Sequence, residues 1–201
     1  MYGLINRSFQ NFICDTYGRG VWQDVVNRAE LPVAEFEPMR PYDDAVTDHV
    51  IDAAATILNK PREAVLEDAG NYLVSHPNAS SLRRLLRFGG VDYIEFLHSL
   101  DDLPDRARLA VPELEMPDLT LCEHTPGRFR LDVTSPHAFF GHVFLGLLRA
   151  MADDYGALVF IEHGGRRGLV EDMMIDVFQT DFAKGRDFDL GASPVASEAP
   201  V

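Results

Sequence analysis

The sequence predicts an α+β fold in which helices come first and an antiparallel sheet follows. Over roughly the first half of the chain, apolar residues recur at three- and four-residue steps, which is the period of an amphipathic helix. After Pro117 the pattern changes, and apolar residues alternate with polar ones as in half-buried strands. Helices followed by strands of this kind are typical of a fold that segregates its helices from an antiparallel sheet.

Six helices are expected before the sheet, because six segments combine an apolar face with residues that begin or end a helix. Tyr17-Gly18 ends the first helix, the acidic pair Asp43-Asp44 suits the start of the third, and Pro61 lies near the first position of the fourth. The expected helices lie near residues 2–14, 21–29, 42–58, 61–73, 81–88 and 91–103.

The sixth helix is the element around which the rest of the chain is expected to be organised. Its apolar stripe consists of Ile94, Leu97, Leu100 and Leu103 at three-residue steps. Pro104 is expected to end it, because proline cannot continue a helix interior. A loop that contains further prolines then leads to Pro117.

Two hairpins and one long helix are expected after Pro117. Thr125-Pro126-Gly127 separates the first two alternating segments, and the glycine-rich run 164–168 separates the last two. This run does not precede a helix, so a turn is a better interpretation than a phosphate-binding loop. Ser135-Pro136 is expected to cap and begin the long helix, which Gly156 ends. The expected strands lie near residues 119–122, 129–133, 158–162 and 169–178.

Length and composition restrict the class of protein. With 201 residues the chain is expected to form one domain, and its net charge of −14 makes a nucleic acid an unfavourable partner. The acidity serves solubility or docking to a basic face of another protein. We expect a cytoplasmic protein, because there is no membrane-spanning run, no signal peptide and only two cysteines, Cys14 and Cys122. A disordered acidic tail is expected over residues 184–201.

Several short motifs, in their order and spacing, resemble one known family. They include Tyr2-Gly3, Tyr17-Gly18, the run Val21–Asp24, Tyr42–Asp44 and Phe96-Leu97. Together they resemble heme–nitric oxide/oxygen binding (H-NOX, or HNOB) domains, among them the amino-terminal domain of the β subunit of soluble guanylate cyclase. The resemblance extends over roughly residues 1–182.

The resemblance implies a fold of about seven helices and a four-stranded antiparallel sheet in two lobes, a helical lobe near residues 1–62 and a mixed lobe near 63–183. It also implies heme between the lobes, a histidine on the organising helix bound to the iron, and a Tyr-x-Ser-x-Arg motif at the propionates. Nitric oxide would move the lobes. The implied partner is a signalling enzyme such as a cyclase, a histidine kinase or an enzyme of cyclic di-GMP turnover.

The heme-binding positions of the family are largely altered in this chain. The segment Leu97–Pro104 fits the family frame without a gap and puts Pro104 where the iron-binding histidine would be. Val133, Ser135 and His137 fit the propionate motif, in which Val133 replaces the tyrosine and His137 the arginine. Proline offers no lone pair to a metal, valine forms no hydrogen bond, and histidine lacks the guanidinium fork.

Other positions are less informative. Ile5 matches an apolar residue over the distal heme face, and Pro117 matches a proline that presses on the porphyrin, although both would serve ordinary packing equally well. His142 lies near the place of a distal tyrosine in oxygen-binding relatives and is the candidate replacement metal ligand, with a buried, hydrogen-bonded histidine as the alternative. His98 is expected off the pocket face of its helix, and His163 is expected at the surface.

Two functions follow from this pattern. The first is a heme-based nitric oxide sensor with an altered ligand set, and the second is a heme-independent sensory or interaction module on the same fold, which would bind another apolar ligand or none. An enzyme is not expected, because no Gly-x-Ser-x-Gly, Walker or dinucleotide motif is present.

Overall fold

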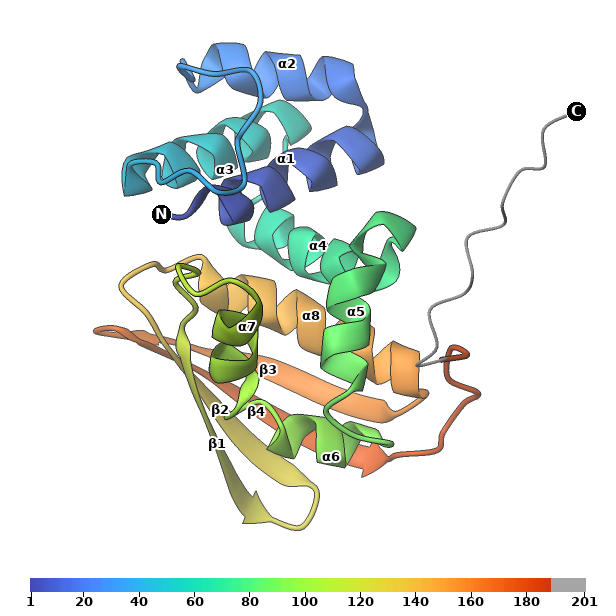
Figure 1. Cartoon of the computed structure of the whole chain (residues 1–201). Coiled ribbons are helices and arrows are strands. Elements are labelled where there is room, and N and C mark those ends of the chain that lie inside the picture. Colours follow the sequence, from blue (N-terminus) through green and yellow to red (C-terminus); the bar gives the residue numbers. More distant parts are fainter. Residues whose placement is uncertain (189–201) are drawn as a thin grey trace, which may run out of the picture.

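The computed structural model describes residues 1–188, and residues 189–201 lie outside the described part of the chain (Figure 1). The helices are α1 (Gly3–Tyr17), α2 (Arg19–Arg28), α3 (Asp44–Leu58), α4 (Arg62–Ser75), α5 (Ser80–Arg87), α6 (Tyr93–His98), α7 (Leu103–Ala110) and α8 (Phe140–Tyr155), with a 3₁₀ turn η1 (Pro77–Ala79). The strands are β1 (Asp118–Thr125), β2 (Arg128–Thr134), β3 (Leu158–Arg167) and β4 (Val170–Gln179).

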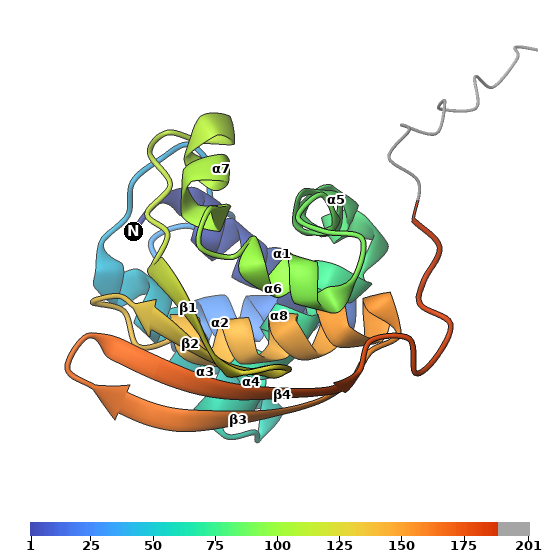
Figure 2. The same cartoon turned by 90° about the horizontal axis from the view of Figure 1, so that it is seen from below.

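The four strands form one antiparallel sheet in the order β1-β2-β4-β3. Helix α8 runs along one face of this sheet, and α4 packs on the opposite side of α8 (Figures 1 and 2). Helices α1, α2 and α3 form a further layer beyond α4. The predicted α+β fold with a four-stranded antiparallel sheet is therefore confirmed. None of the helices among residues 1–188 is both long enough and apolar enough to cross a membrane.

A single cluster of buried apolar side chains connects the helical layers to the sheet. It includes Phe9 on α1, Leu66 on α4, Leu148 on α8 and Leu131 on β2. Each of these side chains is at most 6% exposed. The cluster thus continues through the space between the expected lobes, and the lobe boundary near residue 62 stays a prediction.

The organising helix is interrupted, and its expected end was wrong. Helix α6 ends at His98, and α7 begins at Leu103 with Pro104 in its first turn. Proline is tolerated there because the first backbone N–H groups of a helix have no partner within the helix. Pro104 therefore begins a helix where the sequence pattern predicted that it would end one.

Two further local predictions were wrong. Ser135 does not cap α8, which begins at Phe140, and its Oγ accepts a hydrogen bond from the His137 amide at 3.1 Å within a turn. The glycine-rich run is mostly strand, because β3 continues to Arg167 and only Gly168 and Leu169 separate it from β4. Gly168 adopts a positive φ of 66°, which favours glycine at the turn.

The expected acidic tail begins inside the described part of the chain. The Arg186 amide donates to the Asp154 carbonyl at 2.9 Å, so residues 184–188 lie against the end of α8. The remainder of the expected tail, residues 189–201, lies outside the described residues, and its disorder stays a prediction.

Asp15 connects α1 to α4 and gives an expected pH dependence. Its carboxylate accepts hydrogen bonds from Tyr72 Oη at 2.6 Å and from Asn78 Nδ2 at 2.9 Å. The Tyr72 hydrogen bond is the largest cause that holds the pKa of Asp15 below its ordinary value of 3.8. A folded-state pKa below the unfolded one means that this contribution is present above pH 3.8 and is lost as the pH falls through the folded pKa.

Replacement of Asp15 by asparagine is therefore expected to lower the urea midpoint at about pH 6 and to change it much less at about pH 3. Asp24→Asn, at an exposed position of α2, is the matched control and should follow the unmodified chain at both values. Parallel pH curves for Asp15→Asn and the unmodified chain would contradict the assignment.

Candidate functional site

Pro104, in the first turn of α7, and Pro117, immediately before β1, are both buried. Pro104 lies in the first turn of α7 beside Leu103, which is 3% exposed. Ile5, on α1, is partly buried and packs against the same apolar cluster. The position expected to face the cofactor thus carries a buried ring without a donor atom for a metal.

Val133 and Ser135 lie at the end of β2 and are also buried, with exposed fractions of 1% and 5%. Val133 pairs with Leu119 on β1 and with Glu171 on β4. Ser135 Oγ is engaged locally by the His137 amide, and its carbonyl accepts a hydrogen bond from Arg166 at 2.9 Å. The serine of the motif is therefore held by the turn and by β3.

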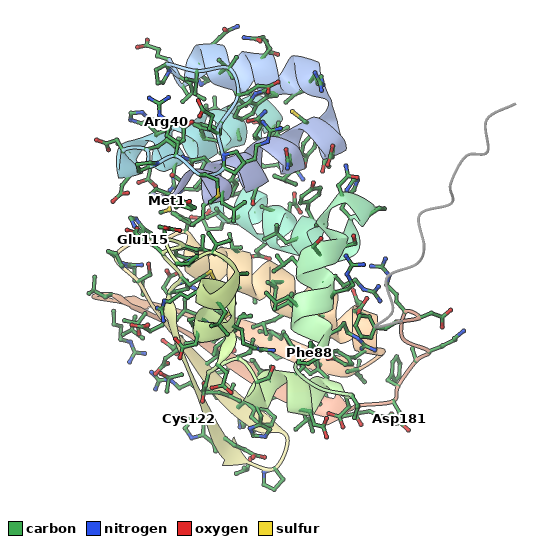
Figure 3. All side chains as sticks on the ribbon, in the orientation of Figure 1. Met1, Arg40, Phe88, Glu115, Cys122 and Asp181 are labelled. Atoms are coloured by element: carbon green, nitrogen blue, oxygen red, sulfur yellow. The ribbon has the colours of Figure 1, made fainter. Side chains whose placement is uncertain are left out.

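His137 contacts the helical layer instead of standing free. Its ring stacks on Phe139 at 5.7 Å between centroids, and Phe139 in turn meets Phe9 of α1 edge to face at 6.0 Å. His137 Nε2 lies 3.8 Å from Asp44 Oδ2, and Asp44 also accepts a hydrogen bond from the amino terminus of Met1. Figure 3 shows Met1 at the boundary between the upper helices and the lower lobe.

His98 does not share the position of Pro104. Its ring packs edge to face on Phe129 at 5.5 Å, and its side chain is 51% exposed, 3.9 Å from Glu123. Pro104, by contrast, is buried. The two side chains thus belong to different surroundings.

His142 lies on the α8 face that meets α4 and the edge strand β3. Its ring stacks on His163 at 4.4 Å between centroids, and its Nδ1 lies 3.6 Å from Glu67 of α4. His163 Nε2 lies 3.1 Å from Glu171 Oε2, and the His163 side chain is only 16% exposed. The expectation that His163 lies at the surface was therefore wrong. The sequence prediction missed it because the expected strand stopped at residue 162, whereas β3 continues and places His163 two residues after the buried Ile161, on the same face.

The residues present do not fit a heme held in the manner that the resemblance implies. No metal-binding atom stands at Pro104, no hydrogen bond is available from Val133, and His137 lies next to the carboxylate of Asp44, which would repel a propionate. Two surface hollows of about 480 and 540 Å³ occur among residues 1–188. One lies between α2 and α3 and the other at α7. Neither is lined by Pro104, Val133 or His137.

A family model and the related proteins found by sequence comparison point to the same family. A family model described as Haem-NO-binding matches residues 2–163. The soluble guanylate cyclase gcy-35 of Caenorhabditis elegans is 29% identical over 104 residues, which are 51% of this chain and 15% of that protein. The soluble guanylate cyclase gcy-31 of the same organism is 23% identical over 155 residues, which are 77% of this chain and 22% of that protein. The chain therefore spans less than a quarter of either relative.

Solved structures resemble the fold over nearly the whole chain. The unliganded Fe(II) H-NOX protein of K. algicida superposes with a TM-score of 0.75 at 19% identity, and the match covers 92% of this chain and 100% of that chain. At this level of identity the likeness concerns the arrangement of helices and strands.

Proposed function

The chain belongs to the Haem-NO-binding family, and on that premise we propose that it is a signalling domain of this family that works without a histidine–iron bond to heme. Pro104 is the observation that carries the proposal. It occupies the position of the iron-binding histidine in the family frame and is buried in the first turn of α7. A heme at this place would lack the bond that normally anchors the iron.

The propionate side supports the same conclusion. A tyrosine, a serine and an arginine would supply hydrogen bonds and a positive charge to the propionates. Here Val133 supplies neither, and Asp44 places a negative charge beside His137. Ser135 Oγ accepts from the His137 amide and keeps only its own O–H to donate. What remains is this one hydroxyl and apolar contact, which hold a porphyrin loosely and do not fix its iron.

The proposed output is contact with a signalling enzyme. The two cyclase relatives are the reason to propose a nucleotide cyclase, with a histidine kinase or an enzyme of cyclic di-GMP turnover as the related choices. A net charge of −14 favours a basic docking face on that partner. In this proposal the partner senses the state of the domain through protein contacts.

The test is the heme content of the untagged protein and its absorbance after addition of hemin. We expect far less than one heme per chain as purified, and no Soret band that shifts when nitric oxide is added to the reduced protein. Stoichiometric heme with such a shift would overturn the proposal, and loss of the shift in His142→Ala would then name the iron ligand.

A gain-of-function variant isolates the missing bond. The triple variant Pro104→His, Val133→Tyr, His137→Arg should bind heme more tightly than the unmodified chain and give a histidine-ligated ferrous spectrum. The matched control carries Pro104→Ala with the same two other changes, so it differs only in the imidazole. Equal heme binding by the two triple variants would show that the residue at position 104 does not reach the iron.

A further inference from the structure

A cluster outside the expected heme position brings three metal-binding side chains together from three elements. His142 on α8, His163 on β3 and Glu171 on β4 each offer one donor atom, and these atoms lie within 4.8 Å of one another. The spacing is close enough for a single ion to contact all three donors after small side-chain rotations. Imidazole nitrogen and carboxylate oxygen are ligands that zinc commonly takes in proteins.

The fold builds this cluster through the register of β3 and β4 and a close backbone approach. His163 pairs with Met173 in the same register as the Ile161–Ile175 pair, and the bulge after His163 places Arg166 opposite Glu171. Met173 is fully buried, so His163 and Glu171 also face α8. A Cβ atom at Gly141 would lie 2.1 Å from Glu171 Oε2, so glycine at this position lets the carboxylate reach the backbone of α8 next to His142.

One ring nitrogen of His142 lacks a hydrogen-bond partner, and a metal ion could take that partner's place. Its Nδ1 is buried and has no hydrogen-bond partner within residues 1–188. A buried polar nitrogen without a partner costs free energy, and buried groups of this kind are uncommon. Glu67 Oε1, at 3.6 Å, is too distant to satisfy it, and that carboxylate is already paired with Arg149. In the neutral tautomer that is protonated at Nε2, this nitrogen has a lone pair that an ion can bind.

Glu171 is already positioned as a ligand. Its side chain is 3% exposed, its Oε1 accepts a hydrogen bond from Arg166 at 3.0 Å, and its Oε2 faces His163 Nε2 at 3.1 Å. Arg166 also donates to the carbonyl groups of Ser135 and Pro136. An outer partner that fixes the orientation of a ligand is typical of metal sites, although the positive charge of Arg166 also opposes a cation.

We propose that His142, His163 and Glu171 bind one zinc ion that joins α8 to the hairpin of β3 and β4. Three protein ligands leave the fourth tetrahedral position to water. In the absence of metal, His163 Nδ1 accepts from the Gly165 amide at 3.2 Å, so Nε2 carries the proton that faces Glu171. On binding, zinc takes the place of that proton at Nε2, and the proton moves to Nδ1.

This exchange requires the Gly165 amide to turn away from Nδ1. Gly165 has a positive φ of 99°, and glycine has the conformational freedom that such a turn of its amide requires. Zinc would therefore reshape the bulge. The change would also reach the Ser135–Pro136 turn, because Arg166 connects Glu171 to both carbonyl groups.

The test uses the untagged chain, freed of metal with a chelator and titrated with zinc chloride against a chromophoric competitor. We expect one zinc ion per chain and a rise in Tm on zinc addition. His142→Ala and His163→Ala should each weaken binding at least about tenfold. His98→Ala, which removes a half-exposed histidine elsewhere, is the matched control and should leave the affinity unchanged.

Two outcomes would overturn the proposal. One is the absence of stoichiometric binding to the unmodified chain. The other is an affinity that neither His142→Ala nor His163→Ala changes. Glu171→Gln, a conservative variant of similar size, covers the case in which an alanine variant fails to fold, and it should also weaken binding. Cobalt substitution of the unmodified chain gives a second readout, because visible absorption bands typical of tetrahedral cobalt are expected and their absence counts against the site.

Discussion

Replacement of Asp154 by alanine is expected to lower the free energy of unfolding by about 3 to 5 kcal/mol. Asp154 lies in the last turn of α8, and its side chain is fully buried. Its Oδ1 accepts a hydrogen bond from Arg83 Nε at 2.8 Å, and Arg87 Nε lies 3.7 Å from Oδ2. Loss of the carboxylate leaves two largely buried guanidinium groups without a counter-charge, which is the costly half of breaking a buried ion pair.

The arginines hold more than one segment to this carboxylate. Arg83 Nη2 also donates to the Asp187 carbonyl at 3.1 Å, and Arg186 Nε lies 3.7 Å from Asp154 Oδ1. Arg87 covers the ring of Tyr155 at 3.9 Å. Helix α5, the end of α8 and residues 186–187 therefore share a single buried charge, and its removal should loosen all three.

Thermal unfolding measures the effect. For a chain of this length, the expected loss corresponds to a fall in Tm of roughly 10 °C. Asp153→Ala, at the exposed neighbouring position, is the matched control and should change Tm little. Asp154→Asn keeps an oxygen that can accept a hydrogen bond from Arg83, so its Tm should lie between those of Asp154→Ala and Asp153→Ala. An Asp154→Ala chain as stable as the Asp153→Ala control would show that the arginines are satisfied by solvent.

The alternating pattern after Pro117 was sufficient to predict both hairpins, because burial on one sheet face imposes a period of two. The same reasoning failed where one residue type signals two structures. Pro104 is compatible with the end of a helix and with its first turn, and the stripe from Leu97 to Leu103 continues across the break at 99–102. Ser135-Pro136 likewise suits a turn as well as a helix start, and tertiary contacts with Arg166 select the turn.

The candidate sites show the same limit. Pro104, Val133 and His137 could be proposed from the sequence because each stands in a continuous sequence frame, and their assignment to heme-binding positions stays a prediction. The cluster of His142, His163 and Glu171 could not be predicted from the sequence. Its members come from three elements and meet only through the register of β3 and β4. His163 lies just beyond residue 162, where the expected strand ended, and the pairing that sets it opposite Met173 cannot be read from a single sequence.

The crossing of α4 and α8 gives the second large expected effect. A Cβ atom at Gly70 of α4 would lie 2.0 Å from the Val143 carbonyl oxygen and 2.8 Å from the Leu147 amide nitrogen of α8. Both neighbours are backbone atoms, so the helices must separate to admit a methyl group. We expect Gly70→Ala to destabilise the chain by about 2 kcal/mol, because overpacking outweighs the gain of roughly 1 kcal/mol from alanine in a helix.

Chemical denaturation of Gly70→Ala should be compared with Gly20→Ala. Gly20 lies on α2 with nothing within 4 Å of its Cβ position, so the same change there should stabilise the chain by up to about 1 kcal/mol. The two substitutions are chemically identical and differ only in what the methyl group meets. Destabilisation by Gly20→Ala, or stabilisation by Gly70→Ala, would contradict the close crossing.

A double-mutant cycle then tests whether the crossing behaves as one contact. Gly146 of α8 approaches α4 in the reciprocal way, since its Cβ would lie 2.0 Å from the Glu67 carbonyl oxygen. Once Gly70→Ala has separated the helices, Gly146→Ala should cost less than it does alone. We therefore expect the double variant to lose less stability than the sum of the single variants, by an amount on the order of 1 kcal/mol. Strict additivity would mean that the two glycines relieve independent contacts, and that α4 and α8 can adjust at one end of the crossing without moving at the other.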